Sequence, residues 1–198
     1  MAVLIIALVL IVYAYISTNN LFPAAFSFQN SFNELNNVWL SNGIDATQLE
    51  SKPIGQVSLT QLNAIGTGIT RFQSTLPESS SNEVDAMQKL SLIHLDLVSL
   101  LKEKKQLDTK ILALPNVASL SGEELCSQID SRKQLQTDIQ SIYNSAATLE
   151  GKLSAFSSSY SDLVSASYIE SLSPNADAIN EESGNFSSSL NDLELWCA

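Results

Sequence analysis

The sequence predicts an all-α protein in which a long N-terminal apolar helix is followed by an elongated antiparallel helical bundle with coiled-coil-like heptads. An unbroken apolar run opens the chain. After it, apolar residues recur at steps of three and four, the period of one helix face. No segment shows the sustained period-two alternation that a half-buried strand requires. The 198 residues suffice for one domain with an N-terminal appendage.

The composition is that of a folded, acidic protein. Apolar residues make up 44% of the chain and charged residues 16%. Ten basic and 21 acidic residues give a net charge of −11, which repels nucleic acid, so no nucleic-acid partner is expected. The short cluster of Lys102, Lys104 and Lys105 is predicted to lie on the solvated face of a helix.

Residues 1–20 are predicted to form an apolar helix used for anchoring or assembly. Residues 2–16 span only about 23 Å as a helix, against roughly 30 Å of bilayer hydrocarbon. Three uses are open: a cleaved signal peptide, a retained membrane anchor, or a helix that packs against copies of itself. The basic residues of a secretory signal are missing, although Val12-Tyr13-Ala14 is a candidate cleavage site. The residues expected to contact lipid or neighbouring copies are Val3, Leu4, Ile5, Ile6, Leu8, Val9, Leu10, Ile11, Val12, Tyr13, Tyr15 and Ile16.

The stretch Val12-Tyr13-Ala14-Tyr15-Ile16-Ser17 resembles the Tyr-Ala-Tyr-like patch that ends the N-terminal helix of archaeal type IV pilin-like proteins. Pro23 similarly resembles the proline that bends the first helix of pilins. A first residue that is already apolar is expected when a basic leader has been removed, as in mature pilins. The Glu that bacterial type IV pilins carry near the start is missing here. The resemblance implies a surface-filament subunit whose apolar helices pack together as a core.

Residues 21–42 are predicted to continue the first helix as an amphipathic segment, and 43–56 to form a connector around Lys52-Pro53. One face of the continuation is apolar, with the residues Ala25, Phe28, Phe32, Leu35 and Trp39.

Residues 57–198 are predicted to form the helical bundle domain. Its four helical segments open at recognisable caps: Ser58-x-x-Gln61, Ser80-x-x-Glu83, Ser121-x-x-Glu124 and Ser173-Pro174. The third segment, if continuous from about 122 to 173, reaches roughly 75 Å. Gly151 and the run Ser157-Ser158-Ser159 are the candidate breaks in it.

Cys126 and Cys197 are a candidate disulfide pair. If the last helix reverses directly at Pro174, Cys197 comes level with about residue 151, roughly 35 Å from Cys126 by helix rise. A disulfide needs Cα atoms within about 7 Å. The bridge therefore requires a broken helix, an additional reversal of the chain, or a bond between subunits.

The remaining candidate sites are few. His94, the single histidine, is expected to be a partly exposed structural residue, because no nucleophile accompanies it at helical spacing. Asn185-Phe186-Ser187 is a candidate glycosylation site at Asn185 if the domain is exported. No catalytic residue, cofactor or metal site is expected, since the chain lacks a nucleophile with its base, a set of metal ligands and a phosphate-binding loop.

These features together predict a non-enzymatic, extracytoplasmic structural protein, either membrane-anchored or part of a cell-surface filament. The pilin-like reading expects self-assembly and at least transient contact with the membrane. The alternative is a single-pass membrane-tethered bundle acting as an adhesin, a sensor or an accessory subunit of a membrane complex. A cleaved, freely secreted helical binding protein is the third reading.

Overall fold

The computed structural model describes residues 26–49, 57–115 and 120–198, and every regular element in these ranges is a helix. The predicted apolar helix of residues 1–20 lies outside the described residues, as does the second half of the predicted connector, residues 50–56. The elements in chain order are α2 (Phe28–Leu40), the 3₁₀ helix η1 (Ala46–Gln48), α3 (Leu59–Gln73), α4 (Asn82–Leu112), α5 (Gly122–Ser127), α6 (Ile129–Ser159), α7 (Ala166–Ser171) and α8 (Ala176–Cys197).

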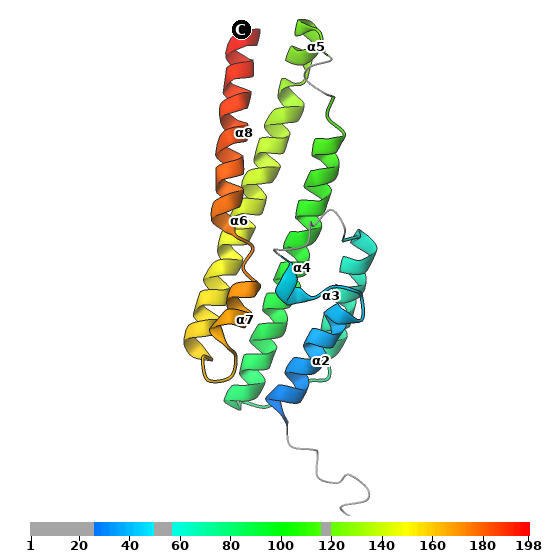
Figure 1. Ribbon diagram of the computed structural model, residues 1–198, viewed down its shortest axis with the longest axis vertical. Helices are drawn as coiled ribbons and strands as arrows, with labels where there is room; N and C mark the ends of the chain where they lie inside the picture. The colour runs from blue at the N-terminus through cyan, green and yellow to red at the C-terminus, as the bar shows by residue number, and fades with distance from the viewer. Residues whose placement is uncertain (1–25, 50–56, 116–119) are drawn as a thin grey trace, which may run out of the picture.

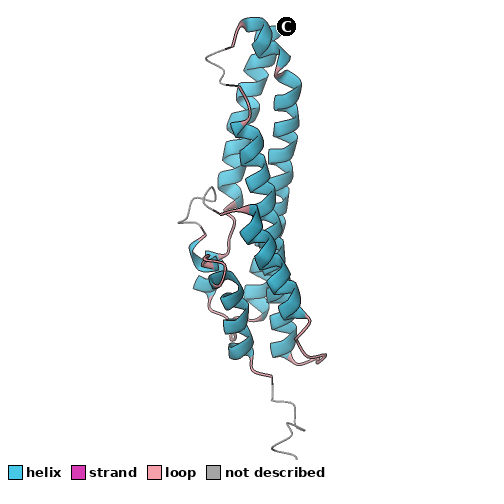
Figure 2. Ribbon diagram, turned by 90° about the vertical axis from the view of Figure 1, so that its right-hand side faces the viewer, coloured by secondary structure: helices cyan, strands magenta, loops and turns pink. Residues whose placement is uncertain are grey.

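Three long helices run along the long axis of the molecule, with α6 between α4 and α8 (Figure 1). The shorter helices α2 and α3 cover only the N-terminal half of α4, so the shape is an elongated rod that is thicker at one end (Figures 1 and 2). The start of α2 lies at the thick end and the C-terminus at the other. The prediction of an all-α fold is therefore confirmed for the described residues.

A polar ladder joins α4 to α6 along their antiparallel seam. Its contacts recur every seven residues on both helices, which is the spacing at which two packed helices present the same face to each other. The rungs are Asp96 with Lys152 at 2.7 Å, Glu103 with Ser145 at 3.4 Å, and Lys110 with Asp138 at 2.6 Å. The hydrogen bond from Lys110 lowers the pKa of the Asp138 carboxyl.

Most residues of the apolar stripes predicted from the sequence lie in the core, although Leu59 and Ile111, which belong to them, are exposed. The following residues of the stripes are all less than 9% exposed: in α3 Leu62, Ile65, Ile69 and Phe72; in α4 Leu90, Ile93, Leu97 and Leu100; in α6 Leu135, Ile139, Ile142, Leu149 and Leu153. Burial of an aliphatic or aromatic side chain contributes about 1.5–3 kcal/mol, so these stripes supply the main driving force for folding.

Two of the predicted caps are confirmed and two are wrong. Ser58 and Ser121 both form full capping boxes, with Gln61 and Glu124 as the reciprocal partners. The cap of α4 is Ser81 instead of Ser80, because the Ser81 side chain accepts the hydrogen bond from the backbone N–H three residues later.

The fourth predicted cap, Ser173-Pro174, is replaced by Asn175. Asn175 adopts a left-handed backbone (φ 52°), which asparagine tolerates better than most residues, and its side chain accepts from the N–H of Ala178. Pro174 therefore precedes the cap and is not the first helical residue.

The predicted continuation of the first helix through residues 21–42 is also corrected. Phe26 and Ser27 are not helical, and Ser27 is an N-cap with extended backbone whose side chain accepts from the N–H of Asn30. Because a capped start satisfies the free N–H groups of the first turn, α2 is a helix with its own beginning at Phe28. It ends at Leu40, two residues before the predicted end of the segment at residue 42.

The predicted continuous helix from 122 to 173 is broken twice. Gln128 separates α5 from α6, and α6 ends at Ser159, next to Tyr160. The second break falls at the end of the serine run, one of the two candidate positions, while Gly151 lies inside α6. Beyond Tyr160 the chain turns and forms the short helix α7, which the sequence analysis did not predict.

A buried chain of hydrogen bonds holds α7 against the thick end of the rod. The Trp39 indole N–H donates to Nδ1 of His94 at 2.8 Å. Nδ1 is thus an acceptor, so the neutral ring carries its proton on Nε2, which donates to the Tyr168 hydroxyl at 3.0 Å. That hydroxyl donates in turn to Oδ1 of Asn36 at 2.7 Å. The chain links α2, α4 and α7 through polar atoms that would be costly to bury without partners.

His94 is fully buried, so the expectation that it is partly exposed is wrong. The aromatic rings of Trp39 and Tyr168, which come from helices distant in the sequence, enclose it from two sides. Burial lowers the pKa of His94 to about 3 and raises the pKa of the Tyr168 phenol above its usual range.

The stability of the fold should depend on pH through His94. Its pKa is about 3 in the folded protein against an ordinary 6.5, so below pH 6.5 only the unfolded chain binds the proton. The free energy of unfolding should therefore fall as the pH is lowered from 7 to 5, by at most about 1.4 kcal/mol per pH unit. Urea unfolding at several pH values measures this change in the free energy of unfolding. His94→Gln, which keeps an acceptor for Trp39 but does not titrate, should flatten the dependence; an unchanged slope contradicts the assignment.

Removal of the Tyr168 hydroxyl should destabilise the fold. Tyr168→Phe leaves the Nε2 proton of the buried His94 without its partner and removes the hydrogen bond to the half-buried Asn36, at a cost of about 1–3 kcal/mol in the free energy of unfolding. The matched control is Tyr143→Phe, since no hydrogen bond to the hydroxyl of this partly buried tyrosine is found in the described part of the chain. Chemical denaturation of both variants should show a loss for the first only.

Candidate interaction surfaces

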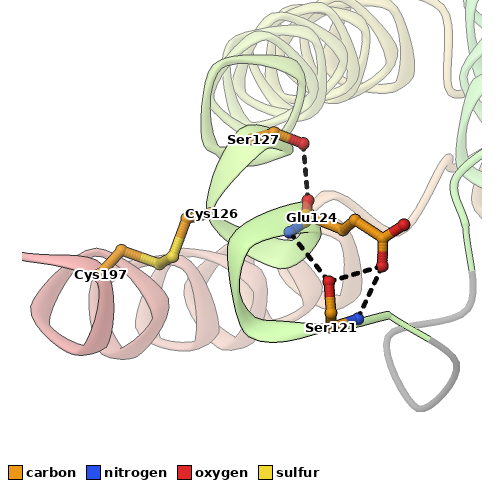
Figure 3. The surroundings of a disulfide bond; sticks show 5 residues. All are labelled: Ser121, Glu124, Cys126, Ser127 and Cys197. Atoms are coloured by element: carbon orange, nitrogen blue, oxygen red, sulfur yellow. Dashed lines mark hydrogen bonds between the residues drawn. A yellow bond between two sulfur atoms is a disulfide. The ribbon is translucent and has the colours of Figure 1, made fainter.

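The disulfide lies at the thin end of the rod. Cys126 of α5 and Cys197 of α8 are bonded within one chain, with their Cα atoms 5.7 Å apart (Figure 3). Of the three arrangements that the sequence left open, the bridge uses a broken helix, because the chain reverses near Tyr160, where α6 ends, and not at Pro174. It closes a loop with a sequence separation of 71 residues.

The position of the first residue of α8 explains how the two cysteines meet. The carboxylate of Glu150, on α6, accepts hydrogen bonds from the backbone N–H of Ala176 and from the hydroxyl of Ser173, both at 2.9 Å. A carboxylate is favourable at this point because the N-terminus of a helix carries partial positive charge. α8 therefore starts level with Glu150 and not with the end of α6.

The lengths of α6 and α8 then match. From Ala176 to Cys197, and from Glu150 back to Ile129, the chain advances 21 residues, which is about 31 Å of helix in each case. Cys197 thus arrives beside the start of α6, next to α5 and Cys126. An ion pair of Lys133 with Glu194 at 2.5 Å joins the same two helices close to this point.

The start of α5 is firmly capped beside the disulfide. Ser121 and Glu124 form the capping box drawn in Figure 3, in which the Glu124 carboxylate accepts from the Ser121 hydroxyl at 2.7 Å and from its backbone N–H at 2.8 Å. These hydrogen bonds lower the pKa of the Glu124 carboxyl. The short helix is thus held at its N-terminus by the cap and near its C-terminus by the covalent bond.

Two large apolar side chains are exposed next to the disulfide: Leu195 is 79% exposed and Trp196 63%. We call the end of the rod formed by Gly122, Cys126 and residues 195–197 the tip. The Trp196 ring lies against Gly122, where a Cβ atom would come within 2.7 Å of the ring. The glycine therefore admits the ring at this position, and the cap and the disulfide fix the backbone around it.

A cavity of about 280 Å³ opens between α4 and α6 at the thick end of the rod. The buried side chains of Ile93 and Phe156 line it, together with Leu92, an apolar residue that is 54% exposed. Polar contacts between the two helices lie at both ends of the cavity: Asp96 with Lys152 at one, and Lys89 with Tyr160 at the other. It is an apolar recess between two exposed ammonium groups.

The polar cluster at one end of the cavity is a structural bridge. Lys89 donates to the Tyr160 hydroxyl at 2.8 Å and to the Asp85 carboxylate at 2.9 Å, and Tyr160 donates to Asp85. The hydrogen bonds from Tyr160 and Lys89 lower the pKa of Asp85, and those with Tyr160 and Asp85 raise the pKa of Lys89. Both groups are thereby held in their charged forms at neutral pH, which suits an ion pair and not a general acid or base.

The other predicted site residues are placed as follows. Asn185 is exposed on α8, so its glycosylation stays a prediction. Leu193 and Phe186, from the predicted α8 stripe, are only partly buried. The apolar residues from Val3 to Ile16 lie outside the described ranges. Within residues 26–49, 57–115 and 120–198, no three His, Cys, Asp or Glu side chains gather closely enough to hold a metal ion.

Sequence reasoning missed both the tip and the cavity. Leu195 and Trp196 fall between Leu193 and Cys197 of the last predicted stripe without belonging to it, and their exposure depends on how far α8 extends along α6. One feature of the sequence could have indicated the cavity: Leu92 is apolar although it falls outside the Leu90–Ile93–Leu97 stripe.

Opening the disulfide should destabilise the thin end of the rod. Replacing both cysteines with alanine should lower the free energy of unfolding by about 2–4 kcal/mol, because the 71-residue separation makes the constraint on the unfolded chain large. Chemical denaturation of the oxidised wild type and of the double variant measures this difference in the free energy of unfolding. Intact mass before and after reduction supplies the control: if the native protein gains no hydrogens on reduction, the bond is not formed and the assignment fails.

Comparison with protein-family models, with curated proteins and with solved structures gave no match in any of the three. Among the described helices, none is both long enough and apolar enough to cross a membrane. What the protein does must therefore be inferred from the disulfide-linked tip, the cavity at the opposite end, and the apolar run that precedes the described residues.

Proposed function

We propose that this protein is a non-enzymatic, extracytoplasmic structural subunit, similar to the pilins, that assembles into a surface filament through its N-terminal apolar helix. The observation that carries the proposal is the disulfide between Cys126 and Cys197. Structural disulfides belong mainly to oxidising compartments outside the cytoplasm. Export of this domain with the apolar run held in the membrane accounts for both the disulfide and the run.

The arrangement of the rod supports the same function. The chain enters the described fold at the thick end, where α2 starts, and the tip lies at the far end (Figure 1). An apolar segment buried in a membrane or in a filament core would thus leave the tip and the long faces of α6 and α8 pointing outward. One helix serves both as membrane anchor before assembly and as the packed core afterwards.

The alternative, a membrane-tethered bundle acting as an adhesin or an accessory subunit, draws support from the exposed Trp196 at the tip. An aromatic side chain held in the open at the end farthest from an anchor suits contact with another molecule. The two functions differ in what surrounds the apolar run: copies of the same helix in a filament, and lipid in an anchor.

Electron microscopy of material purified from its native source separates the two functions. Filaments whose subunits retain Met1-Ala2-Val3 by mass spectrometry support the filament. Discrete particles that need detergent and carry the same N-terminus support the tether and overturn the filament. A truncated N-terminus points to a secreted protein.

A charge within the apolar run should prevent filament assembly. Leu8→Glu places a carboxylate where neighbouring apolar helices are expected to pack, and burial of an unpaired charge costs several kcal/mol. Filament yield in the native host should fall to background, while the circular dichroism of the bundle stays that of the wild type. The matched control, Asn20→Glu, adds the same charge beyond the run and should still assemble. Normal filaments from Leu8→Glu would contradict the proposed core.

A further inference from the structure

The charged side chains are distributed unevenly between the two edges of the rod. Residues 153–198, which include α7 and α8, contain no lysine or arginine but seven acidic residues: Asp162, Glu170, Asp177, Glu181, Glu182, Asp192 and Glu194. Within the described parts of the chain, only Glu194 of these seven forms an ion pair. Glu170, Asp177 and Glu181 are exposed, and the last two lie one turn apart on α8. We call these three carboxylates the acidic edge.

A basic groove lies between α3 and α4. It encloses about 800 Å³, and Arg71 and Lys102 are its only charged lining residues. Lys102 reaches from α4 across to α3, since its ammonium is 3.7 Å from the position of a Cβ atom at Gly66. Neither cation forms an ion pair with any residue of 26–49, 57–115 or 120–198. In a chain of net charge −11, both are thus free to meet a carboxylate from outside.

The other residues of the groove leave recognition to these two cations. Thr67 and Thr70 donate their hydroxyl protons to backbone carbonyls of their own helix, both at 3.0 Å. Leu95 and Val98 add apolar surface but no further donor. The occupant is therefore selected by its negative charge, and a carboxylate forms charge-assisted hydrogen bonds with ammonium and guanidinium groups.

The acidic edge and the groove lie at the same height along the rod. The ladder between α4 and α6 places Lys102 level with residue 146 of α6. The start of α8 beside Glu150 places Glu181 level with residue 145 of the same helix. The two charged residues thus differ in height by about one residue, or 1.5 Å.

The second charge of each surface lies in the same direction from the first. Because α3 runs antiparallel to α4, Arg71 is closer to the thick end than Lys102. Glu170 is likewise closer to the thick end than Glu181, because it lies near Ser157 in the last turns of α6. Two copies that stand side by side in the same orientation therefore present opposite charges to each other at both positions.

The two surfaces cannot meet within one molecule. Figure 1 shows α8 along one edge of the rod and α3 along the other, with α6 and α4 between them. A contact between them therefore joins two copies, and a contact between different surfaces of identical copies continues indefinitely unless it closes into a ring. The described fold begins at the thick end, so copies joined through their apolar runs are expected to stand in the same orientation.

We propose that the α3–α4 groove of one subunit binds the acidic edge of a second copy that stands beside it in the same orientation, with Glu181 opposite Lys102 and Glu170 opposite Arg71. This inference rests on the proposed filament function and adds the side-by-side contact between neighbouring bundles. The apolar run then joins neighbours at one end, and this contact joins them along their length.

Charge reversal in the full-length chain tests the contact from its two sides. Lys102→Glu and Glu181→Lys each place like charges opposite each other, and each should raise the protein concentration needed for filament assembly by about threefold or more. A chain that carries both changes restores opposite charges and should assemble like the wild type. The matched control is Lys104→Glu, which changes the net charge by the same amount outside the groove and should leave assembly unchanged. Thermal unfolding confirms that each variant is folded.

A zero-length cross-link identifies the partner surface directly. A carbodiimide couples an ammonium to a carboxylate that it contacts. In a mixture of isotope-labelled and unlabelled full-length chains, it should couple Lys102 of one chain to Asp177 or Glu181 of another. Lys133 and Glu194, which are 2.5 Å apart in one chain, supply the internal control, since they should couple without mixing of the isotopes.

The outcomes separate the contact from the filament function. Filaments overturn the contact, and leave the filament function standing, if both single variants assemble normally, if the double variant assembles no better than either, or if Lys102 couples elsewhere. Wild-type protein that forms no filaments but couples Lys102 to the acidic edge of another chain overturns the filament function and leaves the contact standing. Neither filaments nor this coupling overturns both.

Discussion

The buried chain of hydrogen bonds through His94 determines how the rest of the molecule is arranged. It runs from the Trp39 indole through the imidazole to the Tyr168 hydroxyl and on to Asn36. Each group donates in the one direction that the indole N–H permits, so both ring nitrogens of the buried His94 have a hydrogen-bond partner. Because α7 carries Tyr168, the chain of bonds fixes where the polypeptide turns back after α6. α8 then begins beside Glu150, and its last turn reaches α5, where the disulfide forms.

The sequence predicts most of the helices and little of their relative position. Stripes at steps of three and four locate α3, α4, α6 and α8 because burying one face is what stabilises each of them. His94 shows where this reasoning stops. Its partners are 55 and 74 residues away, and a lone histidine beside an apolar stripe carries no sign of which distant helices will enclose it. The same holds for Tyr160, whose contacts with Lys89 and Asp85 depend on the register of α4 against α6.

The disulfide illustrates both the reach and the limit of helix geometry. A rise of 1.5 Å per residue correctly excludes a bond between Cys126 and Cys197 in a simple helical hairpin that reverses at Pro174. The same rule, applied from Glu150, brings the two cysteines level. The rule could not give the position of the reversal at Tyr160, because this reversal follows from tertiary contacts and not from a strong helix breaker in the sequence. Ser157, Ser158 and Ser159 mark the place without specifying it.

Polar contacts between the long helices hold the rod in register along its length. The seven-residue ladder between α4 and α6 and the ion pair between α6 and α8 prevent the helices from sliding, while each exposed rung alone contributes little to stability. The covalent bond lies at the end where the packing is thinnest, since α2 and α3 cover only the other half. The bond beneath exposed Leu195 and Trp196 holds the last turn of α8 against α5 and so fixes where these two side chains lie.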